Sequence, residues 1–231
     1  MNNNEVNKTR SEENMSEKNM QFKGKLLVAL GDSITAGTNS VYYSLKSEHN
    51  FASYLAKDFG MEIKNYAFPG ATSNDVLNQA KNMEKNVENV SIITILVGAN
   101  DIFRGYDREV YRNNLREIIS IAKNKVGRDG IVIVVGLPNI GLLNNLECQN
   151  PLGYIDGKMQ NTFFDFNEIA KEEVNKAKDK ISSSIIFVDI YNINYNDADI
   201  GIDCFHPGKN GHEKIKQAII KSLSSYYNIT N

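Results

Sequence analysis

The fold is decided first by residues 26–34, which read LLVALGDSI. Five consecutive apolar residues predict a short strand buried on both faces, because they lack the polar alternation of a half-exposed strand. The glycine, acid and serine that follow favour a turn, since all three residue types stabilise turns and helix N-termini. A serine on a turn after a central strand projects its hydroxyl from the sheet edge, so Ser33 is well placed to be a nucleophile.

Further apolar runs of the same kind follow along the chain, separated by helical patterns. Apolar residues recur every three or four positions, as on one face of a helix, and Thr72 and Asp75 resemble a capping box before one such pattern. Alternation of strands with helices predicts a parallel sheet covered on both faces, a three-layer α/β/α sandwich. The five expected strands span residues 25–30, 62–67, 91–97, 131–136 and 184–190, and the clearest helices lie at 76–87, 111–126 and 215–223.

The first residues of the chain differ in composition from the rest. Residues 1–22 are dominated by Asn, Glu, Lys and Ser, and this composition predicts a disordered polar tail before a single domain over residues 23–231. The tail has no apolar run that could form a signal-peptide core, so we expect a cytoplasmic protein, with export through a removed leader left open. No segment approaches the roughly 18–20 apolar residues of a membrane span.

Charge and cysteine content exclude several function classes. The formal net charge is −2 and there is no Lys/Arg-rich block, which argues against a nucleic-acid partner. Two cysteines, Cys148 and Cys204, exclude a disulfide framework and leave the redox compartment undecided. Cys204 could be grouped with Asp203, His206 and His212 as metal ligands, but their Cys-x-His-x₅-His spacing fits no common zinc site. We therefore expect no metal.

Four short segments at the carboxyl ends of the expected strands hold the chemically informative residues. Open parallel sheets bind their ligands at this edge. The three longest irregular segments, at residues 38–50, 137–156 and 191–207, belong to the same edge, and long loops in a compact domain are commonly functional. The four segments are residues 31–34, 68–71, 98–101 and 203–207.

These segments contain the groups that acyl transfer needs, namely a nucleophile, a base, and donors for the oxygen that becomes negative. Ser33 and His206 supply the first two. Asp203, three residues before the histidine, can orient its imidazole. The backbone N–H groups of Ser33 and Gly70 and the side-chain amide of Asn100 would complete an oxyanion hole.

Together these residues resemble the SGNH hydrolases, also called the GDSL esterase/lipase family, over residues 26 to about 222. The Ser, Gly, Asn and His for which the family is named correspond to Ser33, Gly70, Asn100 and His206. The family's acid lies three positions before the histidine, which is Asp203 here.

The motif blocks agree closely with this family. Residues 98–101, GAND, match its Gly-x-Asn-Asp block, and the first block departs only at Ile34, where a leucine often stands. The resemblance implies a flavodoxin-like fold and an esterase, lipase or acylhydrolase that cleaves carboxylic esters or thioesters through an acyl-Ser33 intermediate. It implies no cofactor and no metal.

Two other functions remain open. An acyltransferase would use the same residues and pass the acyl group to an alcohol instead of water. A non-catalytic flavodoxin-like or receiver-like binding domain would use Asp32 and Asp101, but residues 189–192 lack the lysine that a receiver needs after its fifth strand. A dinucleotide-binding domain is disfavoured, because no Gly-x-Gly-x-x-Gly turn occurs.

Several polar residues near the motifs have simpler interpretations. We expect Asp32 to cap the turn before the first helix and Asp101 to tie down the loop that presents Asn100. His49 reads as a solvated surface residue. His212 falls in the last helix and reads as a packing residue or the partner in a local hydrogen bond.

The sequence limits the substrate only to a small-molecule, lipid or carbohydrate ester. Tyr42 and Tyr43 could stack on a sugar or aryl group, or simply cover the first helix. A group of apolar residues in the 137–156 loop could form a wall for an acyl chain, or pack the loop onto its own helix. That group consists of Leu142, Leu143, Leu146, Tyr154 and Ile155.

Overall fold

Five parallel strands form the centre of the protein. The structure, a computed structural model, describes residues 22–38, 47–178 and 184–229. Its strands pair in parallel in the order β2-β1-β3-β4-β5, which is the flavodoxin-like order. The expected α/β fold is therefore confirmed. The strands are β1 (Leu26–Gly31), β2 (Glu62–Asn65), β3 (Val90–Leu96), β4 (Val126–Val135) and β5 (Ser184–Val188).

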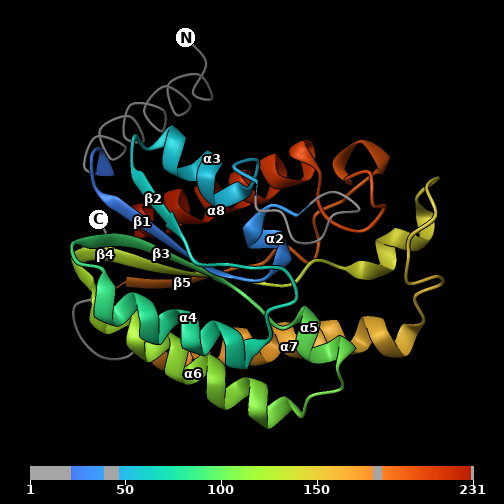
Figure 1. Cartoon of the computed structure of the whole chain (residues 1–231), viewed down its shortest axis with the longest axis horizontal. Helices are drawn as coiled ribbons and strands as arrows, with labels where there is room; N and C mark the ends of the chain where they lie inside the picture. Colours follow the sequence, from blue (N-terminus) through green and yellow to red (C-terminus); the bar gives the residue numbers. More distant parts are fainter. Residues whose placement is uncertain (1–21, 39–46, 179–183, 230–231) are drawn as a thin grey trace.

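Helices cover both faces of this sheet, as the sequence predicts. Figure 1 shows α3 and α8 on one face and α4, α6 and α7 on the other, which makes three layers. None of the helices in the described ranges is long and apolar enough to cross a membrane. The helices are α2 (Ser33–Ala36), α3 (Phe51–Asp58), α4 (Ser73–Asn86), α5 (Ala99–Phe103), α6 (Arg108–Lys125), α7 (Gly157–Ala177) and α8 (Lys209–Ile229), with 3₁₀ turns η1 (Ile140–Asn145) and η2 (Asp197–Asp199).

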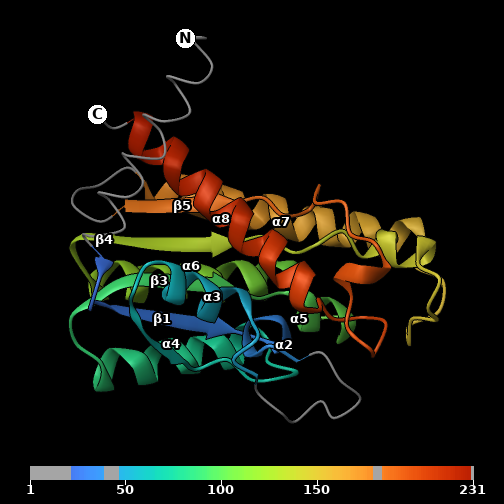
Figure 2. The ribbon, with the colours of Figure 1, turned by 90° about the horizontal axis from the view of Figure 1, so that it is seen from above.

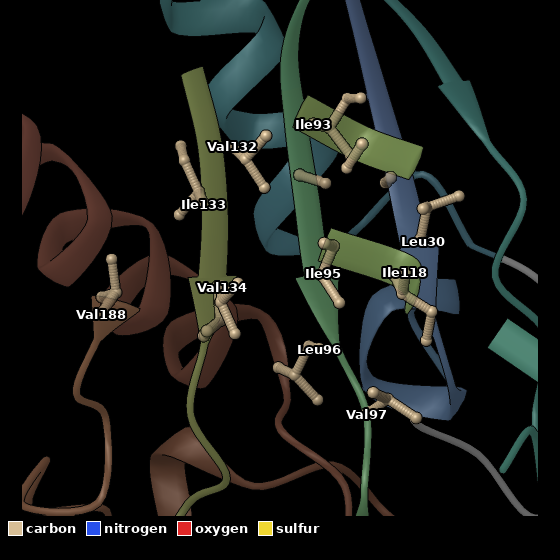
Figure 3. Close-up of a cluster of buried hydrophobic side chains, with 14 of the residues drawn as sticks. Leu30, Ile93, Ile95, Leu96, Val97, Ile118, Val132, Ile133, Val134 and Val188 are labelled. Atoms are coloured by element: carbon tan, nitrogen blue, oxygen red, sulfur yellow. The ribbon is translucent and has the colours of Figure 1, made fainter. Parts of the chain in front are cut away.

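The core lies where the sheet meets these helices. The side chains of β1, of β3 and of β4 from residue 130 onward are almost all buried, which explains why these stretches are mainly apolar. In Figure 3, Ile118 of α6 projects beside Leu30 of β1 and Ile95 of β3. Burying one such aliphatic side chain contributes about 1.5–3 kcal/mol. The apolar strands therefore fix the sheet, and the amphipathic helices close over it.

Several boundaries differ from the expectation, and two of the differences have a clear structural reason. β4 begins at Val126, five residues before the predicted start, because pairing of Val126 with Val90 continues the ladder through three exposed residues that have no apolar pattern. Phe22, the last residue assigned to the polar tail, is only 2% exposed and stacks on Phe59 with ring centroids 5.7 Å apart. The rest of the tail and Tyr42 and Tyr43 lie outside the described residues.

The strand order reverses between β1 and β3, and this position determines where a ligand can bind. From β1 the chain proceeds to β2 on one side, whereas β3 leads to β4 and β5 on the other. Connections that diverge in this way leave a crevice at the carboxyl ends of the two strands. Ser33 begins α2 directly after β1, and Asn100 lies in α5 directly after β3. Figure 2 shows α2 and α5 at the same end of the sheet.

A buried side-chain amide on α4 holds the end of β1 in place. Gln79 of α4 accepts a hydrogen bond from the Gly31 N–H at 2.9 Å and donates to the Gly31 carbonyl at 2.9 Å. A Cβ atom on Gly31 would lie 2.6 Å from the Leu96 carbonyl oxygen and would also collide with Thr35. Only glycine fits here, so the turn that carries Ser33 is positioned both by close packing and by hydrogen bonds.

We predict that Gln79→Met destabilises the protein by about 1–3 kcal/mol, because it leaves the buried N–H and C=O of Gly31 unpaired while roughly conserving volume. Urea denaturation measures the change. Gln217→Met, at an exposed glutamine on α8, is the matched control and should change stability by less than about 0.5 kcal/mol. Equal effects of the two substitutions would show that the amide clamp contributes nothing.

Candidate active site

Ser33 and His206 are in direct contact, although 173 positions separate them in the sequence. The His206 Nε2 lies 2.8 Å from the Ser33 Oγ. Ser33 is partly exposed at the start of α2, whereas His206 is only 4% exposed. The predicted pair is therefore brought together by the fold, with the hydroxyl accessible and the imidazole covered.

Asp203 holds the other side of the imidazole. Its Oδ2 lies 2.8 Å from the His206 Nδ1, and its Oδ1 accepts the backbone N–H groups of Phe205 at 3.0 Å and His206 at 2.9 Å. Burial acts to raise the pKa of Asp203, but the hydrogen bonds from His206 and Phe205 outweigh it and lower the pKa below its usual value. Asp203 is therefore ionised at neutral pH.

The tautomer of His206 follows from these contacts. An ionised carboxylate can only accept hydrogen bonds, so the Nδ1 facing Asp203 carries the ring proton. The Nε2 of a neutral imidazole is then a lone-pair acceptor for the Ser33 hydroxyl. This is the arrangement in which a histidine can remove a proton from a serine.

The loop that carries Asp203 and His206 is braced by its own backbone. Ile200 and Pro207 form an antiparallel bridge, and the Gly201 N–H donates to the His206 carbonyl at 2.8 Å. Cys204 lies between the acid and the histidine with φ of 56°, a left-handed conformation that is uncommon for a residue with a side chain. The tight loop brings a carboxylate three residues away back onto the imidazole.

Gly70 and Asn100 lie on the other side of Ser33. All three residues line the same cavity. Gly70 adopts φ of 79°, which glycine reaches without steric cost. The Asn100 Nδ2 donates one hydrogen bond to the Ala71 carbonyl at 3.0 Å, which fixes the amide and leaves its second N–H for another acceptor.

Three residues with N–H donors therefore line one cavity. Ser33 is the first residue of α2, so its backbone N–H has no partner within that helix. The N–H of Gly70 and the amide of Asn100 come from the two flanking loops. The residues predicted for an oxyanion hole thus come from the segments after β1, β2 and β3 and border the same cavity, and their role there stays a prediction.

Asp101 ties two of these segments together, as expected. Its carboxylate is fully buried and accepts hydrogen bonds from the Ser73 N–H at 2.8 Å and from the Ser73 hydroxyl. Ser73 begins α4, just after Gly70. The contact therefore sets the position of the Asn100 loop relative to the Gly70 loop.

Arg104 is a site residue that the sequence analysis missed. Its Nη2 donates to the Gly70 carbonyl oxygen at 2.9 Å, and its side chain is exposed at the rim of the site. An exposed arginine directly after a short helix carries no pattern of its own, so no signal in the sequence identifies it. Gln79, also missed, could have been noticed as a polar residue on the otherwise apolar face of its helix.

The two remaining histidines behave as expected. His49 is exposed and lies 3.4 Å from the Tyr54 hydroxyl. His212 is fully buried and stacks on Phe51, and neither ring nitrogen has a hydrogen-bond partner among the described residues. Burial, together with the charge of His206, lowers the pKa of His212 to about 3, so it stays neutral and serves packing.

No group of three or more His, Cys, Asp or Glu side chains suited to hold a metal ion occurs within the described ranges. Cys148 and Cys204 are both free thiols. A hydrogen bond between these two thiols and partial burial raise the pKa of Cys148 to about 11, so its thiol stays protonated at neutral pH.

A cavity of about 710 Å³ opens beside the Ser33 hydroxyl. Leu142, Leu143 and Leu146 line it, which agrees with the alternative of an apolar wall. Tyr154 and Ile155 are not among its lining residues: Tyr154 is 82% exposed, and Ile155 is buried in the core. The acyl-wall interpretation is therefore wrong for these two residues, and the burial of Ile155 agrees with the alternative in which the loop packs against the protein.

The chain matches the family model for GDSL-like lipases/acylhydrolases over residues 27–219, which covers the sheet, the flanking loops and about the first half of the last helix. The chain belongs to this family. It is accordingly a hydrolase that acts on ester bonds. The matched region contains all five residues of the candidate site, which are Ser33, Gly70, Asn100, Asp203 and His206.

Solved structures share the fold at low sequence identity. A lipolytic G-D-S-L family protein from Veillonella parvula is 18% identical with a TM-score of 0.63, covering 85% of this chain and 96% of that one. A catalytic mutant of an acetylxylan esterase from Geobacillus stearothermophilus has 19% identity and a TM-score of 0.61, covering 87% and 94%. A phospholipase A1 from Streptomyces albidoflavus has 17% identity and a TM-score of 0.61, and the match covers 86% of this chain and 99% of that one. No curated protein matches the sequence.

Asp32 stands directly before the nucleophile and caps α2, as expected. Its Oδ1 accepts the Ile34 N–H at 3.0 Å, but its Oδ2 is buried without a hydrogen-bond partner among the described residues. Burial raises the pKa of Asp32 to about 7, against smaller opposing effects of the Ile34 N–H and of His206. The carboxyl group is therefore half-protonated near neutral pH.

We predict that Asp32 makes the protein less stable as the pH rises from about 4 to 7. In this window the unfolded chain has released the proton that the folded chain still holds, so the free energy of unfolding falls with pH. Asp32→Asn keeps the capping oxygen and removes the ionisation. Chemical denaturation at pH 5 and pH 8 should show the variant gaining stability relative to the parent at the higher pH. An equal difference at both pH values would contradict the raised pKa.

Proposed function

We propose that the protein hydrolyses carboxylic esters or thioesters through an acyl-enzyme on Ser33. The observation that supports this most directly is the continuous line from Asp203 through His206 to Ser33, with 2.8 Å at each side-chain contact. The line ends at a partly exposed hydroxyl in a cavity, where a substrate can reach it.

In the first half-reaction the Ser33 Oγ attacks the carbonyl carbon of the ester while the His206 Nε2 takes the hydroxyl proton. The imidazolium that forms is stabilised by the ionised Asp203, which also keeps the ring oriented. The carbonyl oxygen becomes negative and accepts hydrogen bonds from the donors at Ser33, Gly70 and Asn100. His206 then gives its proton to the departing alcohol or thiol.

In the second half-reaction a water molecule replaces the leaving group. His206 takes a proton from the water, the resulting hydroxide attacks the acyl carbon, and the same donors hold the oxyanion again. Collapse of the intermediate breaks the bond to Ser33, and His206 returns the proton to its oxygen. The acid is released and the enzyme is restored.

We predict that Ser33→Ala lowers turnover of p-nitrophenyl esters by about 10⁴–10⁶-fold, because the acyl-enzyme cannot form. A fluorophosphonate probe should label the parent at Ser33 and leave the variant unlabelled, as read by mass spectrometry. Ser225→Ala, at an exposed serine on α8, is the control and should keep both activity and label. Label that persists in Ser33→Ala would refute the assignment.

We predict that Asn100→Ala lowers kcat by about 10²–10³-fold and changes KM much less, since its amide acts mainly when negative charge develops on the substrate oxygen. Steady-state kinetics on a soluble ester measure both constants. Asn113→Ala, at an exposed asparagine on α6, should leave them unchanged. A rise in KM alone would make Asn100 a ground-state binding group instead.

A further inference from the structure

We propose that this enzyme acts on esters of an extended apolar acyl chain, which the cavity beside Ser33 holds, and not preferentially on esters of acetic acid. This inference rests on the proposed function, and it names the substrate class of the same site. It is drawn from the size of the cavity, the composition of its walls and the way the walls are arranged around Ser33.

The size of the cavity exceeds what a short acyl group can use. An acetyl group has only two carbon atoms and fills a small part of a cavity of about 710 Å³. The volume lies within the range of about 300–1,000 Å³ found for pockets that enclose drug-sized ligands. An acyl chain of eight or more carbons therefore fits.

One wall of the cavity is made of leucines from the segment after β4. Leu142 and Leu143 come from η1, and Leu146 and Leu152 from the loop that follows. Leu143 is 6% exposed, whereas Leu152 is 41% exposed. The wall thus runs from the protein surface at Leu152 into the interior at Leu143.

The other wall is a cluster of phenylalanine rings. The Phe103 ring of α5 lies 5.7 Å from that of Phe163 on α7 and 6.0 Å from that of Phe205, measured between centroids. Phe163 has no exposed surface and Phe103 is 36% exposed, so this wall also runs from the surface inward. Phe205 directly precedes His206 and packs edge-on against its imidazole at 4.8 Å, which joins the apolar wall to the reacting groups.

Polar side chains are few in the cavity and gather where the chemistry is proposed. Asp32, Ser33, Asn100 and His206 belong to the reacting end, and Asn139 and Tyr195 are the other polar side chains that line the cavity. The rest of the lining is aliphatic, aromatic, proline or glycine. A carbohydrate would leave its hydroxyl groups facing these apolar walls without hydrogen bonds, which is unfavourable.

The apolar chain is assigned to the acyl side of the ester because of the order of events. The acyl group stays bonded to Ser33 while the alcohol departs and water arrives. A cavity enclosed on two sides by leucine and phenylalanine walls suits the group that is retained, whereas the leaving group needs an open path to solvent.

The test is the dependence of kcat/KM on acyl length for p-nitrophenyl esters from acetate to decanoate, each below its micellar concentration. Full burial of a methylene is worth about 0.8 kcal/mol, or about fourfold in kcat/KM. Because burial in the cavity is incomplete, we expect at least about a 50-fold rise from acetate to octanoate. A parallel series of acetates with alcohols of increasing length should show no such rise. Preference for acetate, or a gain that follows the alcohol, would overturn the proposal.

Two tryptophan variants locate the effect in the cavity. Leu146→Trp fills part of the leucine wall and should lower the octanoate-to-acetate ratio of kcat/KM by at least tenfold while hydrolysis of acetate is retained. Val110→Trp, at a 46% exposed position on α6 that does not line the cavity, is the matched control and should leave the ratio unchanged. If Leu146→Trp fails to fold, Leu142→Trp repeats the test. An unchanged ratio in the folded variant would overturn the assignment of the wall.

Failure of this inference can be told apart from failure of the proposed function. An enzyme that is labelled at Ser33 and hydrolyses the acetate, but shows a flat profile with acyl length, keeps the mechanism and loses the substrate class. An enzyme without label at Ser33 loses the mechanism, whatever its profile.

Discussion

The 2.8 Å contact between the His206 Nε2 and the Ser33 Oγ is the interaction on which the rest of the site depends. It joins two loops at opposite ends of the chain, and each loop is held separately. Gln79 clamps the strand end before Ser33, while the bridge between Ile200 and Pro207 braces the loop of His206. A displacement of either loop by an ångström would break the contact, so the hydrogen bonds far from the reacting atoms are part of the site's function.

Holding these groups in place has costs for stability. The Oδ2 of Asp32 is buried without a partner among the described residues, and burial keeps its pKa near 7. Cys204 is held in a left-handed conformation between the acid and the base. Such departures from ideal local structure persist where surrounding packing enforces them, and they concentrate at functional sites. The largely buried strands β1 and β3 and the second half of β4 supply the compensating stability.

The scaffold leaves the substrate undecided. An acetylxylan esterase and a phospholipase A1 both superpose on this chain with a TM-score of 0.61. The fold alone therefore does not determine the substrate, and in this chain the loops at the carboxyl ends of the strands line the cavity. In this chain the leucines after β4 and the three contacting phenylalanines give that edge an apolar cavity, and this is a property of side chains, not of the fold.

Local patterns in the sequence determined the strands, the layered fold and the five residues of the candidate site, because buried strands need continuous apolar residues and the motifs follow strand ends directly. Helices α3 and α7 were not predicted, although α7 carries Phe163 and Phe166 at helical spacing. The early start of β4 was not predicted either, because only pairing with β3 creates it. The contact of Arg104 with Gly70 and the division of the loop residues between cavity, core and solvent were also decided by the tertiary structure. These features depend on which segments come into contact at the edge of the sheet, and no local pattern of residues determines those contacts.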